Sequence, residues 1–146
     1  MIPPPAATII STPTALASLL ASIPPFSTLY IDLEGTKFGS PTGALSLITI
    51  HLLPSNTTHL IDVLTLGVSA FTTSPTSDPS KTLASMLTDP IYPKCLWDVR
   101  ADASALWSLY RICLQGIMDI QILENASRQG GSRKFLRGLD KAINPL

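Results

Sequence analysis

Hydrophobic and polar positions follow two different periods along the chain, and these periods predict the first elements. Residues 12–23 carry leucines at helical spacing with Pro13 in the first turn, so they predict a short amphipathic helix that stops before Pro24. Apolar runs then predict three strands, at about 28–33, 44–53 and 58–63. The polar turn "PSNTT" between the last two strands is typical of a hairpin, so these strands should be antiparallel neighbours.

The second half of the chain alternates helical and strand periods. The stretch "GVSAFTTSPTSDPSKT", residues 67–82, is rich in Ser, Thr and Pro and predicts a surface loop. Beyond it the pattern predicts a helix within 79–90, a strand at 94–99, a helix at 102–112, a strand at 116–120 and a helix at 121–128.

A last amphipathic helix is predicted at about 132–143. Its apolar face should pack through Phe135, Leu136 and Leu139. Its other face should expose four basic side chains, those of Arg133, Lys134, Arg137 and Lys141.

Hairpin-linked strands followed by alternating strands and helices indicate an α/β fold. Antiparallel strands need only turns, whereas parallel strands need helical crossovers, so we expect a mixed sheet with helices on both sides. The first of the three apolar runs should be a central strand, because it is too continuously apolar for an edge.

Composition limits the number of domains and indicates where the basic residues lie. The chain has 146 residues, of which 45% are hydrophobic and 14% charged, so we expect one compact domain over 1–146 with an ordered core from about residue 12. The formal net charge is zero, yet five of the ten basic residues lie in the last nineteen positions, with Asp140 as the only acid there. A nucleic-acid footprint should therefore be sought near the C-terminus.

Cysteine usage and hydropathy bear on the compartment. Cys95 and Cys113 lack the spacing of a zinc site or a disulfide framework, which favours a reducing environment. The chain begins without a basic segment and contains no run of the roughly 20 apolar residues that a membrane span needs. We therefore expect an intracellular protein of the nucleus or cytoplasm with no membrane partner.

The stretch "LYIDLEGTKFGS", residues 29–40, places two acids inside an apolar run. Side chains at alternate positions of a strand point to the same side, so Asp32 and Glu34 should project together. Like charges at that spacing repel each other, and a divalent metal relieves the repulsion most directly. An N-capping role cannot explain acids in the middle of a strand, so this pair is the first candidate site.

Three further acids lie at strand ends or just beyond them. Asp119 should cap the helix that follows it, and Asp98 is compatible with a solvated turn residue. For Asp102, at the start of a predicted helix, capping and metal ligation are equally compatible with the sequence. If Asp102 is a ligand, we expect it to converge with Asp32 and Glu34, and we expect the pKa of at least one of the three to be raised.

The order of these pieces resembles a known family. The segments "LYIDLEG", "GALSLITI", "THLIDVLTLG" and "KCLWDVRADASALWSLYRICLQGIMDIQILENASR" are similar to the RNase D-like branch of the 3'-5' exonucleases, in the DEDD superfamily, and particularly to fungal proteins that carry this domain. The resemblance implies a ribonuclease H-like fold and hydrolysis of phosphodiesters from single-stranded 3' ends. It also implies two divalent ions, Mg²⁺ or Mn²⁺, held by acidic side chains.

Carried over residue by residue, the resemblance assigns catalytic and metal-binding roles to Asp32, Glu34 and Asp102. Gly35 would let the nucleic-acid end approach the backbone, or it serves only as a turn glycine. Arg133 and Arg137 are candidate phosphate contacts, with an ordinary solvated helix face as the alternative.

The sequence departs from the family after Asp102. The family's third motif supplies a final Asp with a Tyr or His a few residues before it, and the residues that follow Asp102 here contain no such pattern. We therefore expect a domain that lacks its last catalytic helix, with impaired activity. The alternative is a non-catalytic nucleic-acid-binding or protein-interaction module that retains the exonuclease fold.

Overall fold

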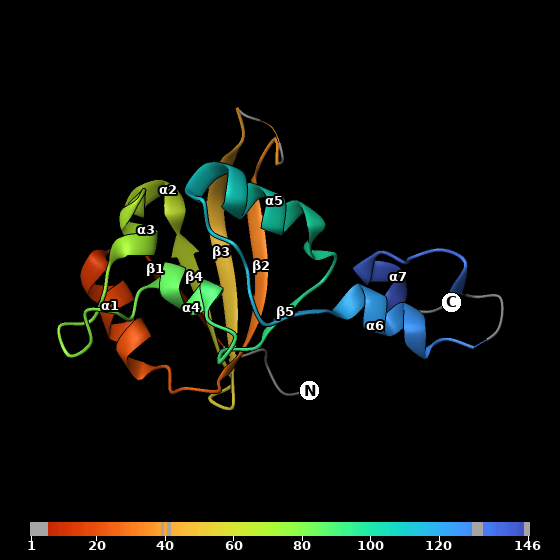
Figure 1. The fold of residues 1–146 in the computed structure, drawn as a ribbon, viewed down its shortest axis with the longest axis horizontal. Helices are drawn as coiled ribbons and strands as arrows, with labels where there is room; N and C mark the ends of the chain where they lie inside the picture. Colours follow the sequence, from red (N-terminus) through yellow and green to blue (C-terminus); the bar gives the residue numbers. More distant parts are fainter. Residues whose placement is uncertain (1–5, 39, 41, 130–132, 145–146) are drawn as a thin grey trace.

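The computed structural model describes residues 6–38, 40, 42–129 and 133–144. Its centre is a six-stranded mixed sheet with the strand order β1-β4-β3-β2-β5-β6 (Figure 1). The strands are β1 (Ala7–Ile10), β2 (Thr28–Thr36), β3 (Ala44–Leu53), β4 (Thr57–Asp62), β5 (Lys94–Leu96) and β6 (Ile117–Asp119).

Strand β2 lies inside the sheet, between two different kinds of neighbour. It pairs along its whole length with antiparallel β3, and its first residues pair with parallel β5. Strand β4 continues the antiparallel meander beside β3, while β1 and β6 add parallel strands at the two edges. The predicted central position of the strand that carries Asp32 is confirmed.

Seven helices are described, and local capping explains where several begin. They are α1 (Pro13–Ser22), α2 (Val63–Leu66), α3 (Ser69–Thr72), α4 (Leu83–Thr88), α5 (Val99–Tyr110), α6 (Ile120–Ser127) and α7 (Leu139–Ile143), counted over the described residues only. The Thr12 hydroxyl accepts the Ala15 N–H at the start of α1, and Thr82 and Ser85 form a reciprocal capping box at the start of α4. None of the described helices has the length and apolar character that crossing a membrane requires.

Helices α1 to α5 cover one face of the sheet. The connections β1 to β2, β4 to β5 and β5 to β6 all step across the sheet in the same direction, so right-handed crossovers put their helices on the same face. On β2 this face carries the buried side chains of Leu29, Ile31 and Leu33, which join one core cluster with the helices.

The second face of β2 corrects our expectation of helices on both sides. Along this strand Tyr30, Asp32 and Glu34 are exposed, in strict alternation with the three buried residues. In Figure 1, α6 and α7 extend to the right as an arm beyond the edge of the sheet. The described residues therefore leave the face that bears the two acids open over β2.

The predicted C-terminal helix at 132–143 is wrong over most of its length; its first residue lies outside the described part of the chain. Helix α7 begins only at Leu139, after Gly138, and Phe135, Leu136 and Leu139 are exposed rather than packed. The reason is that side chains of α6 and of Arg128, the residue that follows it, bind the carbonyls a longer helix would need. The Arg128 guanidinium donates to the Phe135 carbonyl, and the Gln121 amide donates to the Arg137 carbonyl at 2.9 Å.

Two other segments differ from the sequence prediction. The stretch 67–82 is not only a surface loop, because it contains helix α3 with Ala70 and Phe71 buried in the core. Strand β1 at the first edge was not predicted; it is four residues long, too short for a clear period.

Candidate active site

Strand β2 fixes where Asp32 and Glu34 lie. Each residue pairs with a residue of β3 on the same face, Asp32 opposite Thr49 and Glu34 opposite Leu47. Since both acids are exposed on the open face, they project together as the spacing predicts. Exposure also means that neither carboxylate carries the burial cost that the apolar sequence around it suggests.

Gly35 ends the regular part of this pairing for a structural reason. The register shifts between Glu34 and Gly35, and a Cβ built on Gly35 would lie 2.2 Å from the Ala44 carbonyl oxygen and 2.7 Å from the Phe38 ring. Only glycine fits such a close approach of two strands. The local packing therefore explains this glycine without any contact to nucleic acid.

Asp102 approaches the pair from another element. It lies in the first turn of α5, inside the helix and not at its cap, and the residue is only 7% exposed. Its pKa is raised to about 7, first by burial and then by the negative charges of Asp32, Asp98 and Glu34. The raised pKa that the sequence predicts at this site is confirmed, and it falls on Asp102.

Asp98 is engaged elsewhere. It precedes α5 with a positive φ of 58° and caps no N–H with its side chain. Its carboxylate instead binds Arg100 through two hydrogen bonds of 2.6 and 2.9 Å, and these hold the pKa of Asp98 below its usual value. Asp98 is thus occupied by a partly exposed ion pair, which favours Asp102 as the acid that faces β2.

Asp119 caps α6, as predicted, and does more. Its carboxylate accepts the N–H groups of Gln121 and Ile122 at the start of α6, at 3.0 and 3.4 Å. It also accepts the N–H groups of Asp98 and Val99 at the start of α5, at 3.3 and 3.2 Å. Sequence reasoning missed this second role, because nothing local in the sequence links residues 20 positions apart.

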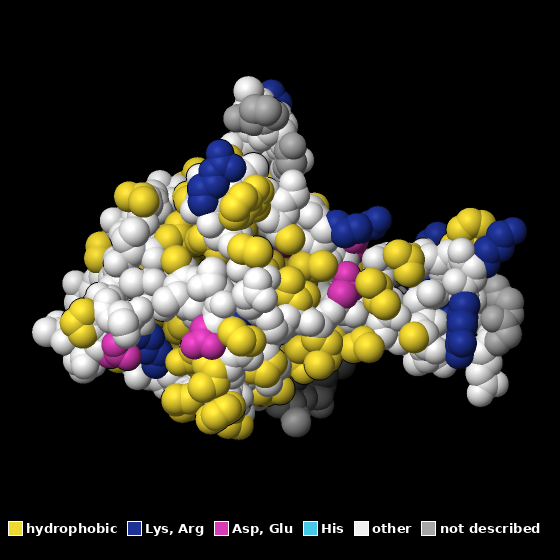
Figure 2. All heavy atoms as spheres, in the orientation of Figure 1, with side chains coloured by type: hydrophobic (Ala, Val, Ile, Leu, Met, Phe, Trp, Pro, Cys, Tyr) yellow, Lys and Arg dark blue, Asp and Glu magenta, His cyan; other side chains and the backbone are white. Residues whose placement is uncertain are grey.

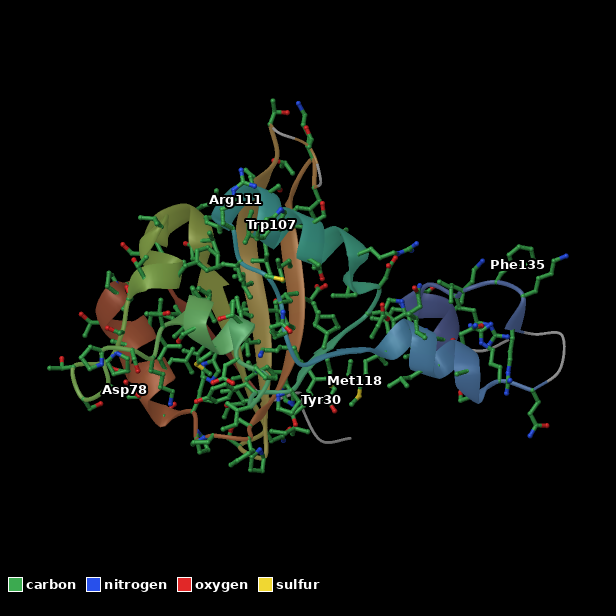
Figure 3. The ribbon with its side chains drawn as sticks, in the orientation of Figure 1. Tyr30, Asp78, Trp107, Arg111, Met118 and Phe135 are labelled. Carbon is green, nitrogen blue, oxygen red and sulfur yellow. The ribbon has the colours of Figure 1, made fainter. Side chains whose placement is uncertain are left out.

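A pocket of about 360 Å³ lies beside Asp32 on the open face. Tyr30 and His51 meet across β2 and β3 with ring centroids 6.2 Å apart. The same row of the sheet continues through Cys95 to Met118, and Figure 3 shows Tyr30 and Met118 near each other. The pocket is lined by Tyr30, Ile31, Asp32, Thr49, His51, Cys95, Leu96, Trp97, Ile120 and Leu139.

The basic C-terminal segment lies on the arm, which Figure 2 shows carrying several Lys and Arg side chains. Arg128 is 9% exposed and pairs with Glu124 at 2.6 Å, while Arg137 lies 3.9 Å from the same carboxylate. The Arg133 side chain donates to the Arg128 carbonyl. A concavity of about 680 Å³ is lined by Arg128, Lys134, Phe135, Leu136, Arg137, Gly138, Asp140 and Lys141.

The donor set at the open face suits a hard cation. Its members are carboxylates, the ligands that Mg²⁺ and Mn²⁺ prefer, and the neighbouring negative charges that raise the pKa of Asp102 are those a bound cation would offset. Within the described parts of the chain, however, no three His, Cys, Asp or Glu side chains are close enough to hold one ion as they stand. Metal binding would have to draw the three acids closer together.

Comparison with known proteins identifies the family. A family model described as 3'-5' exonuclease matches residues 7–141. The chain belongs to this family. A comparison with curated proteins gave no match.

Solved structures agree with this assignment. The chain is similar to Trypanosoma brucei RNase D in complex with the RNA U12, with a TM-score of 0.67 and 23% identity over 82% of this chain and 39% of that one. Escherichia coli RNase D, described as an exoribonuclease involved in structured RNA processing, matches with a TM-score of 0.60 and 26% identity. The match covers 88% of this chain and 32% of that one. The EXD2 exonuclease domain soaked in Mg and GMP matches with a TM-score of 0.58 and 25% identity. The match covers 80% of this chain and 57% of that one.

These matches confirm the predicted fold, a ribonuclease H-like α/β sheet with flanking helices. The chain spans about a third to just over half of the length of these relatives.

Proposed function

We propose that this exonuclease domain hydrolyses nucleic acid from single-stranded 3' ends, with Asp32, Glu34 and Asp102 as its metal-binding acids. The observation that supports this most is Asp102, a carboxyl group whose pKa is raised first by burial and then by neighbouring negative charges that include both acids of β2. RNA is the first substrate to test, because Trypanosoma brucei RNase D was solved with RNA.

Each acid has a distinct part in this proposal. Asp32 and Glu34, both exposed, present carboxylate oxygens to divalent ions from the central strand. Asp102 must lose its proton before it can bind a cation, so metal binding at neutral pH releases protons from this group. When bound, Mg²⁺ or Mn²⁺ supplies an activated water and stabilises the charge on the leaving 3' oxygen.

We expect weak activity from this sequence alone. The acids that follow Asp102 are engaged or exposed: Asp119 accepts four backbone N–H groups, Glu124 pairs with arginines, and Asp140 is exposed on α7. No residue placed to orient an attacking water is evident among the described side chains after Asp102. Such general acid or base help typically contributes about 10²- to 10⁴-fold in rate.

The test is degradation of a 5'-labelled single-stranded oligoribonucleotide in Mg²⁺ or Mn²⁺, with the 3' end free. We expect slow shortening from the 3' end that stops with EDTA and is lost in Asp32→Ala. Asp78→Ala is the matched control, because Asp78 is an exposed acid that hydrogen-bonds only locally with Ser80. Equal rates for wild type and Asp32→Ala would reject the assignment of the site.

A non-catalytic nucleic-acid-binding module is the second candidate, and the basic concavity on the arm favours it. Phosphates would contact Arg137, which lines this concavity, and Arg133, the residue before its lining residue Lys134, while the exposed Phe135 would stack on a base. Each neutralised phosphate adds roughly 0.7 to the slope of log affinity against log salt for single strands. Binding without degradation, with a salt slope reduced in the Arg133→Ala, Arg137→Ala double variant, would favour this candidate.

A further inference from the structure

The first turn of α5 lacks a cap of its own. Asp98, the residue at the N-cap position, has a positive φ of 58° and directs its carboxylate to Arg100. A helix start whose N–H groups find no acceptor is costly when it is partly buried. Here the acceptor comes from β6, where Asp119 binds the N–H groups of Asp98 and Val99.

The same carboxylate also holds the start of α6. Asp119 Oδ1 accepts the N–H groups of Gln121 and Ile122, while Oδ2 accepts that of Val99. Asp119 lies opposite Leu96 in the register of β6 with β5, immediately before the segment that leads into α5. One side chain therefore ties the end of the sheet to two helix starts, one of which carries Asp102.

We propose that Asp119 is a positioning residue that holds the Asp102 carboxyl group against Asp32 and Glu34. This rests on the function proposed above, because it assigns Asp119 a part in building that metal site. Asp119 acts through the backbone: it binds the first turn of α5, in which Asp102 lies three residues after Val99.

The experiment measures Mn²⁺ affinity by calorimetry on the full chain. Residues that orient metal ligands typically change affinity about 10- to 100-fold, so we expect at least tenfold weaker binding in Asp119→Ala. Asp119→Asn keeps one oxygen for α6 and loses the acceptor for Val99, so it should weaken binding by an intermediate factor. Thr82→Ala removes a helix cap on α4 and should leave the affinity unchanged even if it lowers the melting temperature.

A second readout does not depend on the metal. Hydrogen exchange should show the amides of Asp98 and Val99 protected in the wild type and in Thr82→Ala, and unprotected in Asp119→Ala. In Asp119→Asn only the Val99 amide should lose protection, because Asp98 binds the oxygen that also serves α6 and that Asn keeps. If Asp119→Ala binds Mn²⁺ like the wild type, or keeps these amides protected, the positioning role is wrong.

The two proposals fail in different ways. If the wild type does not bind Mn²⁺, or Asp32→Ala binds it equally well, the proposed function fails, and hydrogen exchange alone decides whether Asp119 fixes the first turn of α5. If Asp119→Ala does not fold, the Mn²⁺ affinity and the hydrogen exchange are both measured on Asp119→Asn.

Discussion

At the scale of single residues, Asp102 is the side chain whose burial has the clearest consequence. Its carboxyl group is held in the first turn of α5, where burial first, and then the charges of three neighbouring acids, raise its pKa to about 7. Below that pH the carboxyl group is mainly protonated in the metal-free protein, and a cation must replace its proton before the group can act as a ligand.

We expect Asp102→Asn to stabilise the metal-free protein at pH 8. Because the folded-state pKa is raised above the ordinary value of 3.8, the folded protein binds more protons than the unfolded chain between about pH 4 and 7. Stability should therefore fall as pH rises through this range in the wild type and stay flatter in Asp102→Asn, which gains on the order of 2 kcal/mol at pH 8. Urea denaturation in EDTA at pH 5, 6.5 and 8 measures this, and parallel profiles for the two proteins would contradict it.

Lys94 is a second buried ionisable residue, on the covered face of the sheet. Its side chain is fully buried, and its ammonium group donates to the Asp89 carbonyl. Burial lowers its pKa to about 8, against an opposing effect of the Asp89 charge. Below that pH the folded protein carries a desolvated cation on β5.

Replacing Lys94 by Met should stabilise the protein at pH 7. A lowered lysine pKa means that the unfolded chain binds more protons than the folded one between about pH 8 and 10.5, so wild-type stability rises with pH there. Lys94→Met keeps the volume, removes the buried charge and should gain roughly 1–2 kcal/mol at pH 7. Thermal melts from pH 7 to 10 test this, with exposed Lys134→Met as the control; a loss of stability in Lys94→Met would show that the ammonium group is needed.

At the scale of elements, long periodic segments are the part that sequence reasoning predicts well. Strands β2, β3 and β4 and helices α1 and α6 lie close to their predicted ranges, because each carries a regular pattern over several residues. The predicted helix at 132–143 failed because Arg128 and Gln121 bind the carbonyls of Phe135 and Arg137, a tertiary effect that no local pattern contains.

One part of the candidate site could likewise be predicted from the sequence, and another part could not. The alternation of β2 predicts that Asp32 and Glu34 share a face, and this follows from strand geometry alone. The choice between capping and ligation for Asp102 needed the structure, because it depends on where α5 begins. The helix starts at Val99, three residues earlier than predicted, which places Asp102 inside its first turn.

Gly35 offers a test of how tightly β2 and β3 are joined beside the acids. A methyl group on Gly35 would meet the Ala44 carbonyl at 2.2 Å, so Gly35→Ala must push the strands apart next to Glu34. We expect a loss of at least about 2 kcal/mol in unfolding free energy. Gly138→Ala is the control, because a Cβ there meets nothing within 4 Å; equal stability of the two variants would contradict the packing argument.

At the scale of the whole molecule, the sheet separates a packed side from an open one. Helices α1 to α5 bury one face in a single core, and the acids of β2 project from the other. Asp102 belongs to a helix of the packed side, yet the charges of these acids contribute to its raised pKa, so the candidate site lies where the two sides meet. A ligand that binds all three acids would link β2 to α5 and stabilise the folded chain as a whole.

This linkage predicts that protons and metal ions compete in thermal stability. At pH 8 we expect millimolar Mn²⁺ to raise the melting temperature, with a gain of about 2.7 kcal/mol once its concentration is 100 times the dissociation constant. At pH 6, where Asp102 is largely protonated, the shift should be smaller, because the ion must first displace that proton. Asp32→Ala and Asp102→Asn should lose most of the shift and Asp78→Ala should keep it, while EDTA should reverse it in every protein. A shift that is equal at both pH values and survives in Asp102→Asn would place the metal elsewhere on the molecule.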